Sequence, residues 1–237
     1  MELSDLEKIR VEKINRLREL GIEPYPTRAN STHTTAEALR LFEAAEKAAA
    51  PESPVQPEVV TLAGRIRSTR LMGKITFAHI EDGSGRVQLF LRVNDLGEEQ
   101  MKFFADYFDL GDFIEASGEM FRTRTGEVTL HVRSFRMLAK AVSPLPAAKD
   151  EVVDGQVVRH ATLSDPEMRY RQRYADLAVN PEVREIFRLR AAIVRALREF
   201  LDERGFLEVE TPILQPLYGG AAAQPFITHH NQLKQDL

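Results

Sequence analysis

Five segments between residues 58 and 140 alternate apolar and polar residues and are rich in Val, Ile, Thr and Phe. A period of two residues is typical of β-strands that bury one face. The glycine-containing breaks Asp82–Gly85 and Arg124–Gly126 predict tight turns between neighbouring strands. The strands are predicted at 59–70, 74–82, 86–93, 112–121 and 127–138.

A single helix interrupts this series of strands. Residues 97–108 place Met101, Phe104, Ala105 and Phe108 on one stripe, between the third and fourth strands. The resulting order β-β-β-α-β-β is that of an OB-fold, a five-stranded barrel that commonly binds oligonucleotides. We therefore expect the middle of the chain to form such a barrel.

Helical patterns flank the barrel on both sides. Residues 3–20 predict a helix that Gly21 ends, and residues 35–50 predict a second, Ala-rich helix before a run of prolines. A long helix begins at residue 182 and ends at Gly205, and Phe206–Glu210 predicts a strand that Pro212 stops. The apolar stripe of the first helix is Leu6, Ile9, Ile14, Leu17 and Leu20, and that of the long helix is Ile186, Leu189, Ile193, Leu197 and Phe200.

These elements predict an α+β protein with four parts. Residues 1–57 form an N-terminal helical extension and residues 58–142 the OB-fold barrel. Residues 143–181 are a hinge or linker, because they contain two prolines, an acidic patch and a basic-aromatic run. Residues 182–237 begin a further domain.

Composition excludes several classes of protein. The 237 residues contain no cysteine, which excludes disulfides and thiolate metal sites. No run approaches the ~18 apolar residues of a membrane span, and the acidic N-terminus lacks a signal peptide's apolar region. We expect a soluble, cytoplasmic protein with no membrane partner. A net charge of −4 shows that any nucleic-acid-binding surface must come from charge gathered on one side.

Strand alternation predicts such a surface on the first three strands. Val87, Leu89 and Leu91 must face the core, which turns Arg86, Gln88, Phe90 and Arg92 outward. The same reasoning turns Arg65, Arg67, Phe77 and His79 outward. Residues 61–80 carry four basic residues and no acid, whereas residues 94–119 carry eight acids and only Lys102. Aromatic, basic and amide side chains together suit single-stranded nucleic acid.

The same residues allow a structural interpretation. Phe77 and Phe90 can pack beneath a neighbouring loop or domain while the arginines are merely solvated, and Phe90 is the better candidate for such packing. His229 and His230 are adjacent, so in a strand they point to different sides, and we predict no metal site there.

Several motifs resemble those of class II lysyl-tRNA synthetases. In the barrel they are Thr61–Arg67, Met72–Phe77, Asp82–Gln88, Asp109–Asp112 and Thr123–Glu127. Arg169–Leu177 is similar to the hinge of this family, and Phe200–Pro212 to class II motif 1, which implies that residues 182–237 are the truncated beginning of the family's α/β catalytic domain. The most specific part of the resemblance is Gly219–Phe226 followed by Thr228–Asn231. The related aspartyl and asparaginyl enzymes share the barrel and motif 1 but have a different sequence there. Residues 147–162 do not match and are interpreted as an insertion.

The resemblance implies roles for individual residues. In the barrel, Phe77 would stack on the central uracil of the anticodon, and Gln88 would hydrogen-bond it with help from Glu127 and Arg65. Pro212 and the helix 184–204 would lie at a homodimer interface, although from its pattern alone the helix is an ordinary core helix. Gly219, Gly220 and Ala221 would lie beside the lysine and adenylate pocket. The basic residues of the first helix are either a solvated face or a contact to the tRNA backbone.

The family joins lysine to its tRNA with ATP and Mg²⁺, using motifs 2 and 3. Neither motif is recognised before Leu237, so no catalytic residue is assigned and the chain alone is expected not to aminoacylate or to hold these cofactors tightly. The alternative is an OB-fold module that binds tRNA or other single strands without catalysis. An aspartyl-type enzyme is a third, less favoured interpretation.

Overall fold

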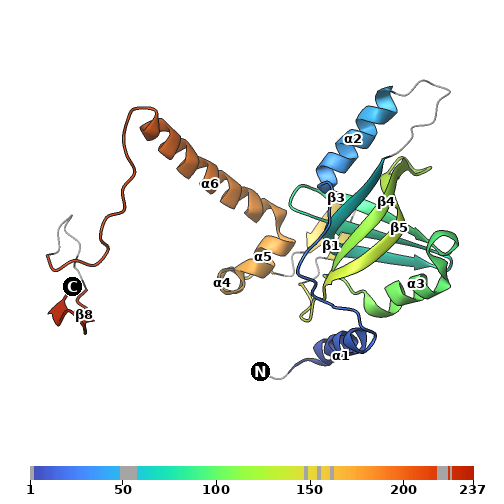
Figure 1. Ribbon diagram of the computed structural model, residues 1–237, viewed down its shortest axis with the longest axis horizontal. Helices are drawn as coiled ribbons and strands as arrows, with labels where there is room; N and C mark the ends of the chain where they lie inside the picture. The colour runs from blue at the N-terminus through green and yellow to red at the C-terminus, as the bar shows by residue number, and fades with distance from the viewer. Residues whose placement is uncertain are drawn as a thin grey trace. The chain divides into compact units, whose positions relative to one another are not determined.

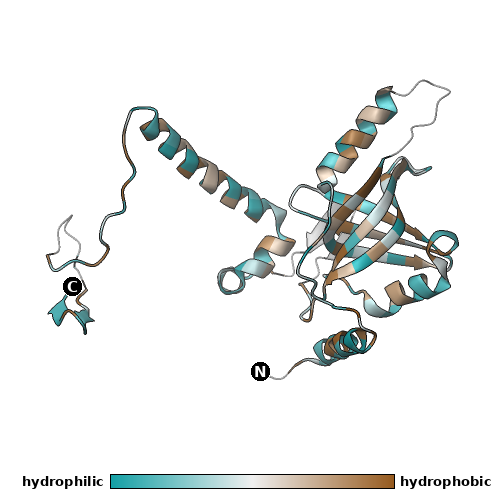
Figure 2. Ribbon diagram, in the orientation of Figure 1, coloured by the Kyte–Doolittle hydropathy of each residue, from teal (hydrophilic) through white to brown (hydrophobic). Residues whose placement is uncertain are grey.

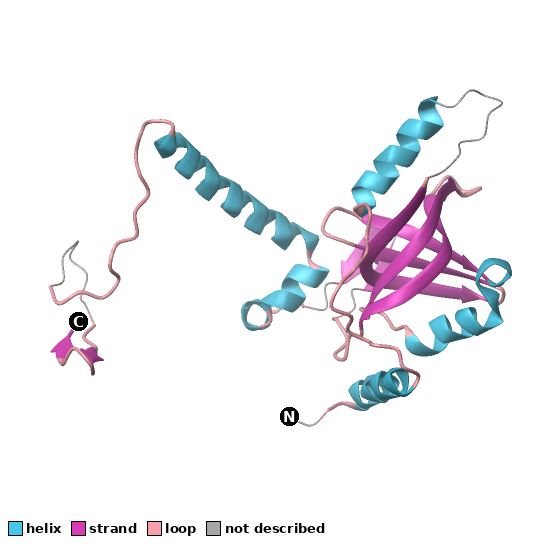
Figure 3. Ribbon diagram, viewed as in Figure 1, coloured by secondary structure: helices cyan, strands magenta, loops and turns pink. Residues whose placement is uncertain are grey.

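A closed five-stranded barrel dominates the first part of the chain (Figures 1 and 3). The computed structural model describes residues 3–48, 58–146, 149–153, 156–160, 163–217, 224 and 226–237. The chain divides into two compact units, Met1–Val179 and Asn180–Leu237.

The barrel confirms the predicted OB-fold. Its strands are β1 (Val59–Met72), β2 (Ile75–Glu81), β3 (Arg86–Arg92), β4 (Phe113–Arg122) and β5 (Val128–Ala139). They close in the order β1-β2-β3-β5-β4, and β3 pairs with β5 in parallel while the other pairs are antiparallel. Gly118 permits the close approach of β4 to β5, because a Cβ there would lie 1.9 Å from the carbonyl oxygen of His131.

Burial follows the alternation that the sequence predicts. Leu62 and Ile66 of β1, Ala78 and Ile80 of β2, and Leu89 of β3 are all buried in the barrel core. Their neighbours along each strand are only partly buried and face outward. In β1 a bulge between Ile66 and Ser68 makes Arg67 the extra residue and shifts the alternation beyond it.

The helix α3 (Val93–Tyr107) joins β3 to β4 and packs on both β3 and β5. Gly97 has a φ of 83° and kinks the helix near its start, so the regular turns match the predicted 97–108. Met101, Phe104 and Phe108 are buried as expected. The prediction for Ala105 is wrong: it is exposed, one position off the stripe that faces the barrel.

Two helices precede the barrel. In α2 (Thr35–Ala48), Ala38 and Phe42 pack into the core, and the turn between β2 and β3 supplies the cap. Asp82 accepts from the backbone N–H of Thr35 at 2.7 Å, and Ser84 accepts from that of Ala36 at 3.0 Å. Burial raises the pKa of Asp82, but the hydrogen bonds from Thr35 and Ser84 outweigh it and lower the pKa to about 2.

The helix α1 (Asp5–Glu19) corrects the predicted apolar stripe. Ile14 and Leu17 are buried, but Leu6, Ile9 and Leu20 are 45%, 51% and 59% exposed. The buried face instead includes Arg10, one turn before Ile14. A basic residue takes this place because backbone carbonyls of the barrel accept its hydrogen bonds, as described below.

The predicted hinge contains regular structure of its own. Strands β6 (Lys149–Val153) and β7 (Gln156–His160) form a hairpin within the predicted insertion 147–162, whose other residues lie outside the described ones. The short helices α4 (Pro166–Arg171) and α5 (Arg173–Val179) follow. Asp176, whose side chain is fully buried, accepts from both Arg169 at 2.9 Å and Arg173 at 2.5 Å and ties α4 to α5.

The second unit contains α6 (Pro181–Asp202), which ends as predicted before Gly205 at a φ of 79°. Brown and teal residues recur along α6 in Figure 2, and its predicted apolar stripe is exposed. The strand predicted at Phe206–Glu210 is wrong, because no described strand pairs with this segment (Figure 3). A short hairpin of β8 (His229–His230) and β9 (Gln235–Asp236) follows.

Candidate nucleic-acid-binding groove

A groove of about 910 Å³ runs over the outer face of β1, β2 and β3 to the loop after β4. Strands contribute most of its surface, so the backbone beneath it is hydrogen-bonded and held in register. Its lining residues are Ser68, Thr69, Arg70, Met72, Ile75, Phe77, His79, Gln88, Phe90, Phe121, Thr123, Arg124, Thr125 and Glu127.

The groove brings together three of the four residues that the resemblance singles out. Phe77, Gln88 and Glu127 all line it, although Glu127 lies 39 residues beyond Gln88 in the sequence. Arg65 does not line it, because it precedes the β1 bulge and its guanidinium stacks over the ring of Phe113 at 4.4 Å. Beyond the bulge the strand turns Ser68 and Arg70 into the groove instead.

Aromatic rings form one wall of the groove. Phe90 lies at the centre of the row, with ring centroids 5.2 Å from Phe77, 5.8 Å from Phe121 and 5.4 Å from His131. Such tilted and edge-on contacts stabilise a cluster of rings. Phe90 thus contacts three rings, whereas the described ring contacts of Phe77 are with Phe90 alone, and Phe77 is partly buried and lines the groove.

Polar side chains lie next to the aromatic rings on the same two strands, where His79 of β2 pairs with Gln88 of β3. Gln88 donates through Nε2 to Glu127 Oε2 at 2.8 Å and accepts at Oε1 from Thr129 Oγ1 at 3.0 Å. His79 lies with Nε2 3.0 Å from Glu127 Oε1 and Nδ1 3.0 Å from Ser68 Oγ. An amide nitrogen has two hydrogens and an amide oxygen two lone pairs. Gln88 therefore keeps one donor and one acceptor for a ligand in the groove.

The groove has more positive than negative charge. Arg70 and Arg124 line it, and within the described part of the chain neither forms an ion pair with a carboxylate. Glu127 is the one acidic residue among the lining residues. Unpaired guanidinium groups beside aromatic rings suit a phosphodiester backbone whose bases stack in the groove.

The acidic side that the sequence predicts is largely neutralised by ion pairs. Of the eight acids in 94–119, five contact basic side chains, and Glu98, Glu99 and Asp106 are exposed without a described ion pair. The five are Asp95, Asp109, Asp112, Glu115 and Glu119. The contrast between basic and acidic sides is therefore smaller than a count of charges indicates.

Asp95 supports the aromatic wall through His131. Its side chain is 7% exposed and accepts from Arg92, from Arg133 and, at 2.8 Å, from His131. The hydrogen bonds from Arg92 hold the pKa of Asp95 well below its usual range, although burial opposes them. A fixed carboxylate at this point orients the His131 ring that packs on Phe90.

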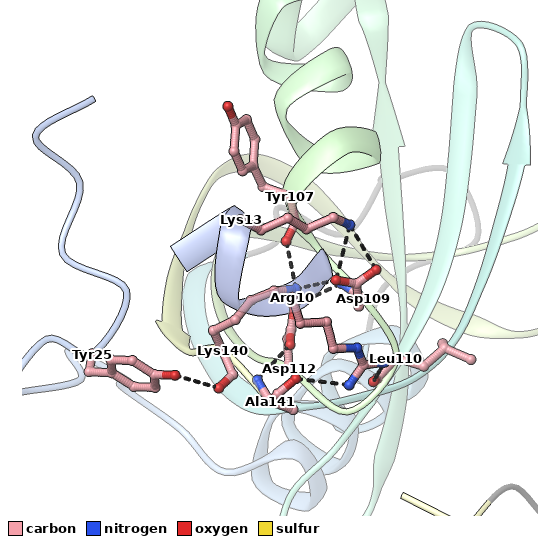
Figure 4. A network of polar contacts seen from close by, with 9 residues as sticks. All are labelled: Arg10, Lys13, Tyr25, Tyr107, Asp109, Leu110, Asp112, Lys140 and Ala141. Atoms are coloured by element: carbon pink, nitrogen blue, oxygen red, sulfur yellow. Dashed lines mark hydrogen bonds and ion pairs between the residues drawn. The ribbon is translucent and has the colours of Figure 1, made fainter. Parts of the chain in front are cut away.

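Two of the basic residues of α1, Arg10 and Lys13, are anchored to the barrel by hydrogen bonds (Figure 4). Arg10 donates to the carbonyl oxygens of Ala141 at 2.8 Å and Leu110 at 3.2 Å, and Lys13 donates to Asp109 at 2.9 Å. Lys140 binds Asp109 and, at 2.7 Å, Asp112. We call Arg10, Lys13, Asp109, Asp112 and Lys140 the clamp. Its bonds support a structural role for Arg10 and Lys13.

The remaining predicted residues lie outside the barrel. Pro212 is exposed in the segment after α6, while Gly219, Gly220 and Ala221 fall outside the described residues. His229 lies 2.8 Å from Asp236, and His230 accepts from the backbone of Leu233 at 3.1 Å. The described residues include no cluster of three potential metal ligands and no helix long and apolar enough to cross a membrane.

Sequence reasoning missed part of the groove. It turned His79 outward without a role, and it did not single out Ser68 or Thr129. Alternation selected Arg65 but not Arg70, because the bulge that shifts the phase of β1 after Ile66 is invisible to it. The pairing of His79 with Glu127 joins positions 48 residues apart, so only the three-dimensional fold reveals it.

Known proteins resemble both parts of the chain. Residues 60–138 match the OB-fold nucleic acid binding domain family, and residues 165–237 match the class II tRNA synthetases of types D, K and N. The match to the first family coincides with the barrel and its groove.

Relatives that align with the whole of this chain are lysine–tRNA ligases. The chain is 52% identical over 238 residues to a lysine–tRNA ligase of Roseiflexus castenholzii, 50% identical to one of Chloroflexus aurantiacus and 44% identical to one of Clostridium novyi. Each alignment covers 100% of this chain but only 45%, 45% and 42% of the relative. The chain thus spans less than half the length of the curated relatives it matches.

Proposed function

The chain is a homologue of the class II lysine–tRNA ligases over its whole length, and from this premise we propose that its barrel recognises the anticodon of a lysine-accepting tRNA. The observation that carries the proposal is the meeting of Phe77, Gln88 and Glu127 in one groove. An aromatic face, a partly free amide and unpaired arginines are the groups that bind a splayed single strand.

Phe77 and Gln88 have complementary roles in the proposal. Phe77 stacks on the central base of the anticodon. This stacking contributes about 1–3 kcal/mol of binding free energy. The free donor and acceptor of Gln88 pair with the Watson–Crick edge of that base. Together they recognise a uracil by its shape and by its pattern of hydrogen bonds.

Charged residues complete the binding surface. Glu127 holds the amide of Gln88, and Arg70 and Arg124 attract the phosphates on either side of the stacked base. The position of Arg65 over Phe113 favours a role in supporting the β1–β4 edge of the barrel.

The wider function belongs to the same proposal. The whole protein would join lysine to its tRNA, as the names of its relatives indicate, and would do so in the cytoplasm. ATP and Mg²⁺ would serve that reaction, although the described residues contain no group of three His, Asp or Glu side chains that fits the metal. Pro212 and the exposed stripe of α6 would form the homodimer interface.

Binding of RNA hairpins tests the anticodon assignment. We expect the chain to bind a hairpin with a lysine anticodon loop at least about tenfold more tightly than one with the central uracil changed to cytosine, a difference of about 1.4 kcal/mol. Fluorescence anisotropy at fixed salt gives both dissociation constants. Equal constants would remove Phe77 and Gln88 from their roles.

A further inference from the structure

The amide of Gln88 lies between two partners of different chemistry. Thr129 carries a hydroxyl, which can either donate to the amide oxygen or accept from the amide nitrogen. Glu127 carries a carboxylate, which when ionised only accepts. Glu127 is therefore the partner that fixes the orientation of the amide. Rotation of the amide by 180° would break the 2.8 Å hydrogen bond from Gln88 Nε2 to Glu127.

Glu127 needs support to keep this role. Its side chain is 46% exposed and follows directly after the turn at Gly126. His79 lies 3.0 Å from the second carboxylate oxygen, so both oxygens of Glu127 are engaged. A carboxylate held at two points has fewer rotamers available than one held at a single point.

Hydrogen-bond directions define a relay from β3 to Glu127. Because the carboxylate only accepts, Nε2 of His79 must carry a hydrogen. Arg86 donates to Ser68 Oγ at 3.2 Å, which leaves the hydroxyl hydrogen of Ser68 for Nδ1 of His79 at 3.0 Å. Each partner in the relay thus has a consistent role, with His79 as its central residue.

We propose that His79 is a positioning residue that sets the preference of the groove for uracil over cytosine. It holds Glu127, and through Glu127 it holds the amide of Gln88 in one orientation. This inference rests on the proposed function, since it assigns the source of base discrimination within the same groove.

The chemistry of the two bases explains why orientation matters. Uracil presents N3–H, a donor, next to a carbonyl acceptor, whereas cytosine presents N3, an acceptor, next to an amino donor. A glutamine amide in one orientation complements the first pattern, and the same amide rotated by 180° complements the second. Loss of the support at Glu127 lets Gln88 adopt both orientations, so cytosine binds better while uracil binds less well.

Two substitutions separate this role from a general contribution to the fold. His79→Phe keeps a ring on β2 but removes both hydrogen bonds, whereas His79→Gln keeps a donor close to the position of Nε2. His33→Phe is the control, because His33 bonds to Thr32 and does not line the groove. The full chain is used throughout, with hairpins that carry uracil or cytosine at the central anticodon position.

The readout is the ratio of the two dissociation constants, cytosine over uracil. His79→Phe is expected to lower this ratio about fivefold to tenfold, with tighter cytosine binding, as the loss of one charge-assisted hydrogen bond predicts. His79→Gln and His33→Phe should keep the ratio within about twofold, because both leave a hydrogen-bond donor to Glu127 in place at position 79.

Three results overturn the inference. The first is a ratio that His79→Phe leaves unchanged, and the second is equal weakening of both hairpins by His79→Phe, which would mark a purely structural role. The third is failure of His79→Gln to restore the ratio. A wild-type ratio near one is a different result, because it overturns the proposed function itself.

Discussion

The groove and the clamp are both polar networks on the same barrel, but they satisfy their hydrogen bonds in different ways. In the clamp, Lys140 and Asp112 have fully buried side chains and bind each other at 2.7 Å. In the groove, His79 and Glu127 are 25% and 46% exposed, and Gln88 keeps a free donor and a free acceptor. Buried polar groups that bond each other support the fold. Partly exposed groups that keep a free hydrogen-bond donor or acceptor can bind a ligand.

The largest expected effect comes from breaking the clamp. Lys140→Met leaves the buried carboxylate of Asp112 without its cation, which should lower the free energy of unfolding by about 3–5 kcal/mol. Urea unfolding measures the loss, with Lys8→Met as the control because Lys8 forms only an exposed pair with Asp5. A change below about 1 kcal/mol, as for a surface pair, would contradict the difference between clamp and groove.

Phe77→Ala should have the second-largest effect, and on binding rather than on folding. Removal of the stacking face should weaken binding of the lysine anticodon hairpin by about 1–3 kcal/mol, roughly fivefold to 150-fold in Kd. Tyr174→Ala removes an exposed aromatic ring outside the groove and is the matched control. If both variants bind as the wild type does, the aromatic wall is not a stacking surface.

Asp82 lies in the turn between two strands of the groove, β2 and β3. It tests whether a carboxylate there stabilises the fold as the carboxylates of the clamp do. Its pKa is about 2 in the folded chain and near 3.8 when unperturbed, so the unfolded chain takes up the proton first. The stabilisation is therefore complete above pH 4 and is lost as pH falls towards 2. Its size should be on the order of 1–2 kcal/mol after screening by solvent.

The measurement compares wild type with Asp82→Asn. Their difference in free energy of unfolding, followed by urea unfolding from pH 6 to pH 2.5, should shrink as the pH falls. A difference that stays constant over this range would show that the Asp82 carboxylate is not the titrating cap of α2.

The smallest effect is expected at the arginines of the groove. Arg70→Gln or Arg124→Gln should reduce the slope of log K against log salt by about 0.7, the contribution of one phosphate contact to a single strand. Stability should not change, since neither residue forms a described ion pair. Arg16→Gln on the exposed face of α1 is the control, and an equal fall in slope there would favour tRNA backbone contact along α1 instead.

Periodicity predicted most of the barrel strands but only some of the residues that line the groove. The inward positions of β1, β2 and β3 follow from the two-residue period, so Phe77 and Gln88 could be placed outside the core. The bulge at Arg67 could not be predicted, because it depends on how β1 bends to pair with two neighbours. The sequence therefore did not place Arg70 in the groove.

Contacts distant in sequence were beyond prediction for a related reason. Arg10 looked like one of several solvated charges on α1, yet it is 5% exposed because Ala141 and Leu110 offer it carbonyl oxygens. The segment Phe206–Glu210 has the composition of a strand but lacks a described partner strand. Local propensity sets what a segment can form, and its neighbours decide what it does form.

Photocrosslinking tests the central claim, that the groove receives the central base of the anticodon. A lysine anticodon hairpin with 4-thiouridine at that position is bound to the full chain, irradiated and analysed by peptide mass spectrometry. The account predicts crosslinks to peptides of β2 and β3 that contain Phe77 or Gln88, and their loss in Phe77→Ala. Crosslinks confined to α1 or α6 would contradict it.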